Sequence, residues 1–156
     1  LENELMNIRA YVKIQLFSYS ESIEVVYNIE EALAGVPFPN FILQPLVENA
    51  LDHGLKNSLK KDKKLTVTVK KEEYMAVDFI SIWIEDNGCG MEKEAVEHLF
   101  SVQTSGYGMK NVNDRLRLLY GDKYTLTITS KPDRGTTAFV RLPCDIGQKN
   151  ESVRNA

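Results

Sequence analysis

One segment of the sequence gathers polar side chains at a spacing that suits metal binding. Helical spacing over residues 40–55 places four of them on one ridge, opposite an apolar stripe: Glu48, Asn49, Asp52 and His53. Amide and carboxylate oxygens are hard ligands, which favour Mg²⁺ shared with phosphates over a soft transition metal. The same pattern also fits a plain solvated helix face, and a lone histidine near a helix end often only caps it.

A second segment, Asp-Asn-Gly-Cys-Gly-Met at residues 86–91, directly follows the most apolar stretch of the chain. Gly88 and Gly90 allow the backbone to approach a ligand closely, and Asp86 can accept a hydrogen bond from a ligand amino group. The segment is therefore a candidate floor for a planar base. A plain turn after a strand would contain the same residue types.

A third segment has the pair Gly106 and Gly108 before an apolar periodicity that predicts a helix over residues 108–120. Free N–H groups and the positive end of the helix dipole attract phosphate there, although a lone Gly-x-Gly is weak evidence. No Gly-Lys-Ser/Thr follows, and the pair does not follow the first strand of a βαβ unit, which argues against Walker and dinucleotide folds. Thr136, after Gly135, is placed to put a hydroxyl beside the base pocket.

The elements that must position these segments alternate along the chain. Strand-like alternation occurs in five ranges: 23–29, 65–69, 77–84, 124–128 and 136–142. Helical spacing occurs in four: 1–18, 40–55, 108–120 and, more weakly, 92–99. The third strand is apolar at nearly every position, which indicates a central strand covered at least partly on both faces. Together these elements predict an α/β sandwich with helices on a face of one sheet.

Composition narrows the class of protein. A length of 156 residues with 43% hydrophobic residues predicts one globular domain, and a net charge of −3 argues against nucleic acid as a partner. The two cysteines, Cys89 and Cys144, form no metal-binding cluster and fit a reduced cytosolic setting. The longest apolar stretch, residues 76–84, is too short to cross a bilayer. Because the chain opens with Leu1 inside a helical pattern, we expect it to be a piece of a longer protein.

The order of the motifs resembles the ATP-binding (Bergerat, or GHKL) fold shared by DNA gyrase, a heat-shock chaperone, histidine kinases and the mismatch-repair protein MutL. The motifs are Glu-Asn-Ala-x-x-His-Gly, Asp-Asn-Gly-x-Gly, Gly-x-Gly-Met-x-Asn and Gly-Thr. The stretches Leu-Gln-Pro-Leu-Val-Glu-Asn-Ala and Asn-Val-Asn-Asp-Arg-Leu are similar to sensor histidine kinases of the LytS and YehU type. The resemblance spans residues 1–143. It implies a two-layer sandwich, in which one mixed, mostly antiparallel sheet of about five strands packs against about three helices.

The resemblance also implies roles for individual residues. Asn49 matches the asparagine that binds Mg²⁺, and with Glu48 and His53 it would form the catalytic group. Asp52 would lie beside the metal and the phosphates, and Asp86 matches the carboxylate that recognises the adenine amino group. The other residues implied to contact ATP are Gly88, Gly90, Met91, Gly106, Gly108, Met109, Lys110, Asn111 and Thr136, and residues 92–105 would form a short lid.

In the function that this resemblance implies, the γ-phosphoryl group of Mg·ATP passes to a histidine on upstream dimerisation helices of a parent homodimer. A response-regulator receiver domain would then receive it. Residues 1–20 would lead from those helices, residues 21–145 would form the ATP-binding domain, and residues 146–156 a disordered tail. We expect this segment in the cytoplasm without membrane contact, and its parent anchored in the bacterial inner membrane.

Three departures from the family pattern qualify this expectation. Pro45 stands where gyrase-like ATPases have the glutamate that activates water, so direct ATP hydrolysis should be slow. Neither His53 nor His98 matches the acceptor histidine of these kinases, and the usual Arg-Phe pair after the first helix is Ser18-Tyr19. Two alternatives share the fold: a serine kinase of the anti-sigma-factor kind, and a non-catalytic ATP-sensing module.

Overall fold

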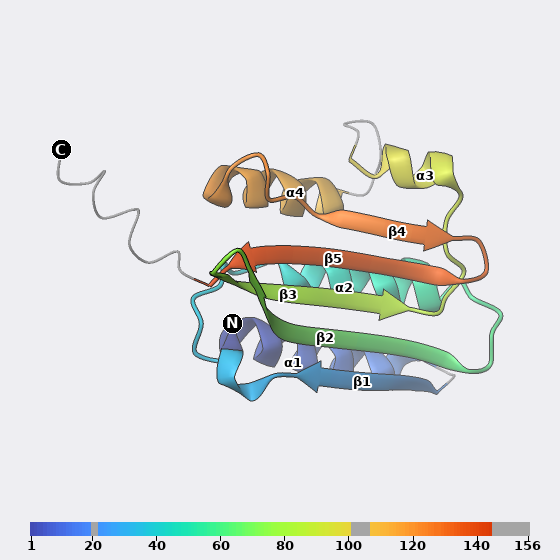
Figure 1. Ribbon diagram of the computed structural model, residues 1–156. Coiled ribbons are helices and arrows are strands. Elements are labelled where there is room, and N and C mark those ends of the chain that lie inside the picture. The colour runs from blue at the N-terminus through green and yellow to red at the C-terminus, as the bar shows by residue number, and fades with distance from the viewer. Residues whose placement is uncertain (20–21, 101–106, 145–156) are drawn as a thin grey trace.

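One five-stranded sheet organises the computed structural model, which describes residues 1–19, 22–100 and 107–144 (Figure 1). Its strands are listed in chain order: β1 (Ile23–Ile29), β2 (Lys63–Tyr74), β3 (Val77–Asp86), β4 (Thr127–Lys131) and β5 (Gly135–Pro143). They lie in the order β1-β2-β3-β5-β4, with β1 parallel to β2 and the other neighbours antiparallel. The predicted mixed, mostly antiparallel sheet is therefore confirmed.

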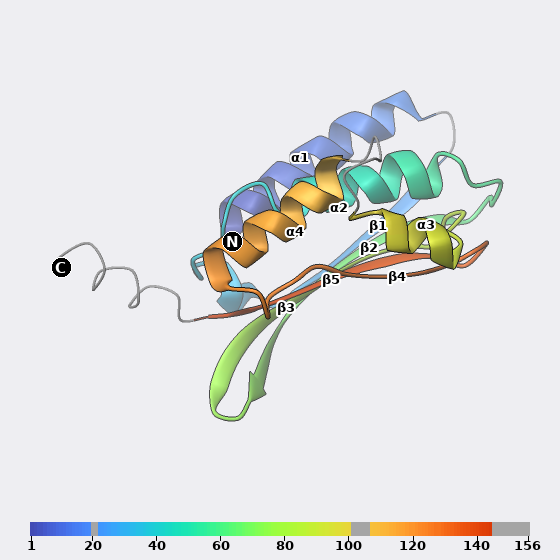
Figure 2. The same ribbon diagram turned by 90° about the horizontal axis from the view of Figure 1, so that it is seen from above.

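The helices cover one face of this sheet, as Figure 2 shows from above. They are α1 (Glu2–Ser18), α2 (Leu43–Glu48), α3 (Lys93–His98) and α4 (Tyr107–Tyr120). α2 continues directly into a π-helix, η2 (Asn49–Leu55), and the short 3₁₀ helix η1 (Glu31–Leu33) follows β1. We call the continuous segment formed by α2 and η2 the α2–η2 rod. With this rod taken as one element and η1 set aside, the described residues form four helical elements, which correspond to the four ranges of helical spacing in the sequence. The family resemblance implied about three, and the additional element is α1, which packs on the same core.

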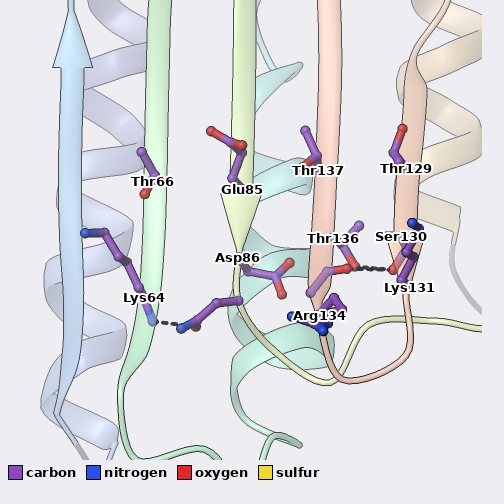
Figure 3. A pocket seen from close by; sticks show the side chains of 12 residues that line it. Lys64, Thr66, Glu85, Asp86, Thr129, Ser130, Lys131, Arg134, Thr136 and Thr137 are labelled. Carbon is purple, nitrogen blue, oxygen red and sulfur yellow. Dashed lines mark hydrogen bonds between the residues drawn. The ribbon is translucent and has the colours of Figure 1, made fainter.

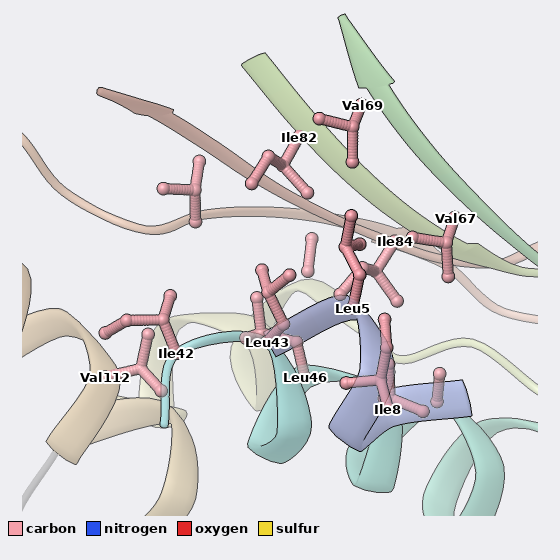
Figure 4. Close-up of a cluster of buried hydrophobic side chains, with 14 of the residues drawn as sticks. Leu5, Ile8, Ile42, Leu43, Leu46, Val67, Val69, Ile82, Ile84 and Val112 are labelled. Atoms are coloured by element: carbon pink, nitrogen blue, oxygen red, sulfur yellow. The ribbon is translucent and has the colours of Figure 1, made fainter. Parts of the chain in front are cut away.

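The core lies between the two layers and follows from the alternation of β2 and β3 (Figure 4). Alternate strand residues such as Val67, Val69, Ile82 and Ile84 are at most 1% exposed and point toward the helices. The helices contribute their own buried stripes: Leu5, Ile8 and Val12 from α1, Leu43, Leu46 and Val47 from α2, and Met109, Val112 and Leu116 from α4. Full burial of each such side chain contributes roughly 1.5–3 kcal/mol, so this interface stabilises the sandwich.

The central position predicted for the strand at residues 77–84 is confirmed, because β3 lies between β2 and β5. In the described part of the chain, helices cover one of its faces, and on the other face Phe79 and Trp83 are half-buried. The Trp83 ring packs on Phe139 of β5 with 5.0 Å between centroids, and Arg141 lies over Phe79. Cross-strand side chains thus shelter this second face, which explains its apolar sequence.

The bounds of β2 and β4 differ most from the prediction, whereas β3 and β5 are longer than predicted by only one or two residues at an end. β2 extends to Tyr74 and turns into β3 through Met75 and Ala76, whose φ angles of 51° and 60° suit a tight hairpin. β4 begins at Thr127 instead of residue 124. Tyr124 packs against Tyr120 at the end of α4, so its alternation reflects helix contact and not a strand.

A buried carboxylate ties α1 to the start of α2. Glu4 is 2% exposed, and its carboxylate accepts hydrogen bonds from the backbone N–H groups of Phe41, Ile42 and Leu43 at 2.8, 3.0 and 3.0 Å. These N–H groups lie at the helix start, where intrahelical acceptors are lacking. α2 has no side-chain cap from its own N-cap residue, so Glu4 supplies one from another helix.

Candidate functional site

The α2–η2 rod presents the two faces that its sequence predicts. Its apolar stripe is at most 3% exposed: Leu43, Leu46, Val47, Ala50 and Leu51. On the other face Glu48, Asn49 and Asp52 are half-buried, while the His53 side chain is exposed. The rod therefore places the three predicted oxygen ligands together at the surface of the helical layer, with His53 at its more open end.

The second half of the rod is a π-helix, which the apolar periodicity did not predict. The backbone N–H of Lys56 donates to the Leu51 carbonyl at 2.9 Å, a five-residue spacing in place of the usual four. π segments are rare and occur often at functional sites. Here the wide turn contains Asp52 and His53, so it sets the direction of the ridge that the sequence singles out.

The oxygen donors of the ridge suit Mg²⁺ that is also bound by phosphates. The Gln44 amide donates to one Glu48 carboxylate oxygen at 2.8 Å, which orients that side chain. Within the described residues, no group of three or more His, Cys, Asp or Glu side chains could hold a metal by itself. Because Mg²⁺ commonly takes one or two protein oxygens and completes its shell with phosphate and water, the chemistry of Asn49, Glu48 and Asp52 fits it.

Asp86 ends β3 with its carboxylate buried between two backbone donors. It is 8% exposed, and it accepts hydrogen bonds from the backbone N–H of Gly88 at 2.8 Å and from that of Thr136. Burial raises the pKa of Asp86 to about 6, against the effect of these donors and of the Lys60 charge. The group is thus mainly ionised at neutral pH and can accept a hydrogen bond from an amino group.

Two glycines bring Asp86 against the end of the helical rod. A Cβ added to Gly54 would lie 2.6 Å from Asp86 Oδ1, and one added to Gly88 would lie 2.2 Å from the Gly54 carbonyl oxygen. The backbone N–H of Cys89 also donates to that carbonyl at 3.0 Å. Gly54 is absent from the predicted site residues, although it ends the Glu-Asn-Ala-x-x-His-Gly motif that carried the signal.

The same loop is fixed to the last hairpin of the sheet. Gly90 has a φ of +64°, and a Cβ there would lie 1.9 Å from the Lys131 carbonyl oxygen, so only glycine fits. The backbone N–H of Met91 donates to Ser130 Oγ at 2.9 Å, and Ser130 Oγ lies 2.9 Å from Thr136 Oγ1. The structure thus brings the predicted residues Met91 and Thr136 together through Ser130, which sequence reasoning missed.

The third motif is described only in part. Gly106 and residues 101–105 of the predicted lid lie outside the described residues, whereas α3 occupies residues 93–98 of that lid. A Cβ on Gly108 would lie 3.6 Å from Pro45 Cβ, which places the start of α4 against α2. Met109 is buried in the core, Asn111 is exposed, and Lys110 forms an ion pair with Asp114 of its own helix.

A cavity of about 390 Å³ opens at the end of the sheet that bears Asp86, on the face opposite the described helices (Figure 3). Thr66, Glu85, Thr137 and Thr129 lie opposite one another on neighbouring strands, and they form a row on this face. Their sequence neighbours Leu65, Ile84 and Ala138 point into the core. Two of the predicted site residues, Asp86 and Thr136, also line this cavity. Its other lining residues are not among the predicted site residues.

Among the described residues, no helix combines the length and the apolar character needed to span a membrane.

Comparison with known proteins identifies the family. Residues 38–146 match the family described as "Histidine kinase-, DNA gyrase B-, and HSP90-like ATPase". The chain belongs to this ATPase family. The match covers the rod, the Asp86 loop and the final hairpin, so the family resemblance drawn from the motifs is confirmed.

Curated relatives of this ATPase family domain are sensor kinases. The chain is 30% identical over 98% of its length to "Sensor histidine kinase YesM" of Bacillus subtilis (strain 168), and over 99% to "Sensor protein LytS" of Bacillus anthracis. It is also 30% identical over 92% of its length to "Sensor histidine kinase BtsS" of Escherichia coli (strain K12). The chain spans only about a quarter of these relatives, covering 24%, 26% and 23% of their lengths.

A solved structure supports the fold. The histidine kinase domain of the Erythrobacter litoralis EL346 blue-light activated histidine kinase superposes with a TM-score of 0.62 and 14% identity. It covers 94% of this chain and 62% of that chain. At this identity the likeness concerns the arrangement of helices and strands alone.

Proposed function

We propose that this chain is the ATP-binding catalytic domain of a two-component sensor histidine kinase. The observation that carries the proposal is the contact between the buried Asp86 carboxylate and the backbone of Gly54 at the end of the α2–η2 rod. Through this contact, an acceptor for an amino group lies at the end of the helix that bears Asn49. An adenine base and a metal-bound phosphate chain would need such a pair of sites.

The residues divide into a base end and a phosphate end. Asp86 would accept a hydrogen bond from the adenine amino group. Thr136 and the loop that contains Gly88 and Gly90 would form a wall beside the base, which we call the adenine wall. At the other end Asn49, with Glu48 and Asp52, would hold Mg²⁺ through oxygen atoms. Mg²⁺, when bound, would neutralise the charge that develops on the phosphates. Lys110 and Asn111, at the first turns of α4, would contact the phosphate chain.

The chemistry at the phosphate end would be transfer and not hydrolysis. The bond between the γ-phosphorus and its bridging oxygen breaks, a bond to a histidine ring nitrogen forms, and ADP leaves. Positioning and charge neutralisation supply most of the catalysis in such reactions. With Pro45 in place of a water-activating glutamate, the site has no general base at that position, which favours transfer to a partner side chain.

The proposed partners follow from the relatives. Sensor kinases act as dimers and pass the phosphoryl group to a response-regulator receiver domain, so we propose both partners for the protein that contains this chain. The acceptor histidine would lie on dimerisation helices upstream of α1. We also propose that this domain works in the cytoplasm and that its parent is anchored in the inner membrane.

An assay of phosphoryl transfer tests the proposal and separates it from the alternatives. The chain is incubated with γ-labelled Mg·ATP and a purified dimerisation-helix fragment from one of the sensor kinase relatives. We expect label on the fragment that is lost in acid and stable in base, as phosphohistidine is. An acid-stable product would instead indicate a serine kinase. ATP binding with no transfer to any such fragment would favour a non-catalytic ATP-sensing module.

A further inference from the structure

α1 reaches the α2–η2 rod at three points along its length. Near its start Glu4 caps the first turn of α2, as described above. In its middle the hydroxyl group of Tyr11 lies beside the Asp52 carboxylate and within reach of the charge of Glu48. Just after its end the Tyr19 hydroxyl donates to the Leu51 carbonyl at 3.0 Å. The last two contacts bear directly on the π turn and on its acidic side chain.

Tyr11 is placed as a donor to the ridge. Its side chain is half-buried, and burial raises its pKa to about 12, with the nearby charges of Asp52 and Glu48 adding to the effect. The phenol therefore keeps its proton throughout the physiological pH range. A neutral phenol can donate a hydrogen bond and an ionised carboxylate can only accept one, so the Tyr11 hydroxyl is able to orient the Asp52 carboxylate beside it.

Tyr19 acts on the backbone of the same turn. The Leu51 carbonyl accepts both the Tyr19 hydroxyl and the Lys56 backbone N–H that closes the π turn. Burial raises the pKa of Tyr19, so it too remains a donor. Because Leu51 is adjacent to Asp52, the end of α1 is linked to the residue beside which the Tyr11 hydroxyl lies.

We infer that Tyr11 and Tyr19 are positioning residues of the Mg·ATP site, through which α1 controls the direction of the Asp52 carboxylate. The inference rests on the proposed function, since it assigns Asp52 to the metal and phosphate end. A shift or rotation of α1 would separate both hydroxyl groups from the rod while leaving Asp86 and its glycines in place. Such a movement would therefore change the binding of the metal and phosphates and spare the adenine wall.

Calorimetry on the whole chain tests this inference. ATP is titrated in excess Mg²⁺ and again in EDTA. The Kd in EDTA divided by the Kd in Mg²⁺ measures the contribution of the metal. We expect Tyr11→Phe and Tyr19→Phe each to reduce that ratio by about three- to tenfold, because each removes one hydroxyl donor beside Asp52 or its neighbour Leu51. Binding in EDTA, which depends on the adenine wall, should stay within about twofold of the unmodified protein.

Two further measurements separate positioning from a merely structural role. Tyr120→Phe is the matched control, since it removes the hydroxyl of a half-buried tyrosine in α4 and should leave the ratio unchanged. Tyr11→Phe is also combined with Asp52→Asn, where it should have little further effect because the two groups act together. Full additivity of the two substitutions would overturn the inference.

The possible results also distinguish this inference from the proposed function. If the unmodified chain binds no Mg·ATP, the proposed function fails and the inference fails with it. If the unmodified chain binds Mg·ATP and both Tyr→Phe variants keep its ratio, the inference alone is wrong. Equal weakening with and without Mg²⁺ would also overturn it, since that pattern indicates loss of fold stability.

Discussion

Asp86 and Gly54 are in such close contact that Gly54 has no room for a side chain. A Cβ on Gly54 would lie 2.6 Å from Asp86 Oδ1 and 2.7 Å from its Cγ. The two residues are 32 positions apart in the sequence, one at the end of the helical rod and the other at the end of β3. This contact joins the motif that bears the oxygen ligands to the motif that bears the amino-group acceptor.

Gly54→Ala should therefore disrupt both the fold and the site. The added methyl group must displace the Asp86 carboxylate or the rod, which we expect to reduce the free energy of unfolding by about 1–3 kcal/mol. Urea unfolding measures this change. Gly35→Ala is the control, because a Cβ there meets nothing within 4 Å and its effect should stay within about 0.5 kcal/mol. Equal effects of the two substitutions would contradict the packing argument.

The identity of the base is predicted to depend on the charge of Asp86. Asp86→Asn replaces an acceptor-only carboxylate with an amide that can also donate, so the preference for ATP over GTP should fall by tenfold or more, about the value of one charged hydrogen bond. Calorimetric titration with each nucleotide measures the preference. Asp133→Asn, in the exposed turn between β4 and β5, should leave it unchanged. Unaltered discrimination in Asp86→Asn would remove this residue from the base site.

The pKa of Asp86 also predicts how stability depends on pH. Burial raises this pKa from 3.8 to about 6, so between these values the folded chain binds a proton that the unfolded chain has lost. The resulting stabilisation is complete below about pH 4 and is lost as the pH rises through about 6. At about pH 8 the Asp86→Asn variant, which never carries this charge, should be more stable by on the order of 2 kcal/mol.

Urea unfolding of both proteins across this pH range measures the difference. The advantage of Asp86→Asn should shrink as the pH falls from about 8 toward about 4. A difference that stays constant over the whole range would mean that Asp86 has an ordinary pKa in the folded protein. A stabilised variant with poorer base selection would show that the buried charge serves binding at the expense of stability.

Sequence periodicity predicted the parts of the fold in which one residue type repeats on one face. β1 was predicted with its observed bounds, and the apolar stripe predicted opposite the polar ridge of the α2–η2 rod is buried. Both depend on burial against a neighbouring layer, which imposes period 2 on a strand and period 3.6 on a helix. Tyr124 shows the limit of this argument, since its alternation arises from contact with Tyr120.

The remainder depends on contacts between segments far apart in the chain. Glu4 caps α2 from another helix, Gly54 meets Asp86 across the two layers, and Tyr19 bonds to the π turn. Nothing in the local sequence distinguishes Glu4 from the exposed Glu2 on the same helix. Only the family resemblance, which orders whole motifs, indicated that residues 48–54 and 86–90 belong to one site.

The cap supplied by Glu4 makes α1 a structural part of the domain. Glu4→Ala leaves three N–H groups at the start of α2 without their acceptor, so the free energy of unfolding should fall by at least about 2 kcal/mol. Glu2→Ala removes an exposed carboxylate from the same turn of α1 and should change it by less than about 0.5 kcal/mol. Thermal or urea unfolding compares the two. Similar losses would show that the cap contributes nothing specific.

The central claim is that the ridge of the α2–η2 rod holds the metal and phosphates of ATP. Calorimetric titration of Mg·ATP into the unmodified chain and into Asn49→Ala tests it most directly. We predict saturable binding by the unmodified chain and a loss of at least about tenfold in affinity for Asn49→Ala, confined to titrations that contain Mg²⁺. Binding of Mg·ATP by Asn49→Ala as tight as that of the unmodified chain would contradict the account.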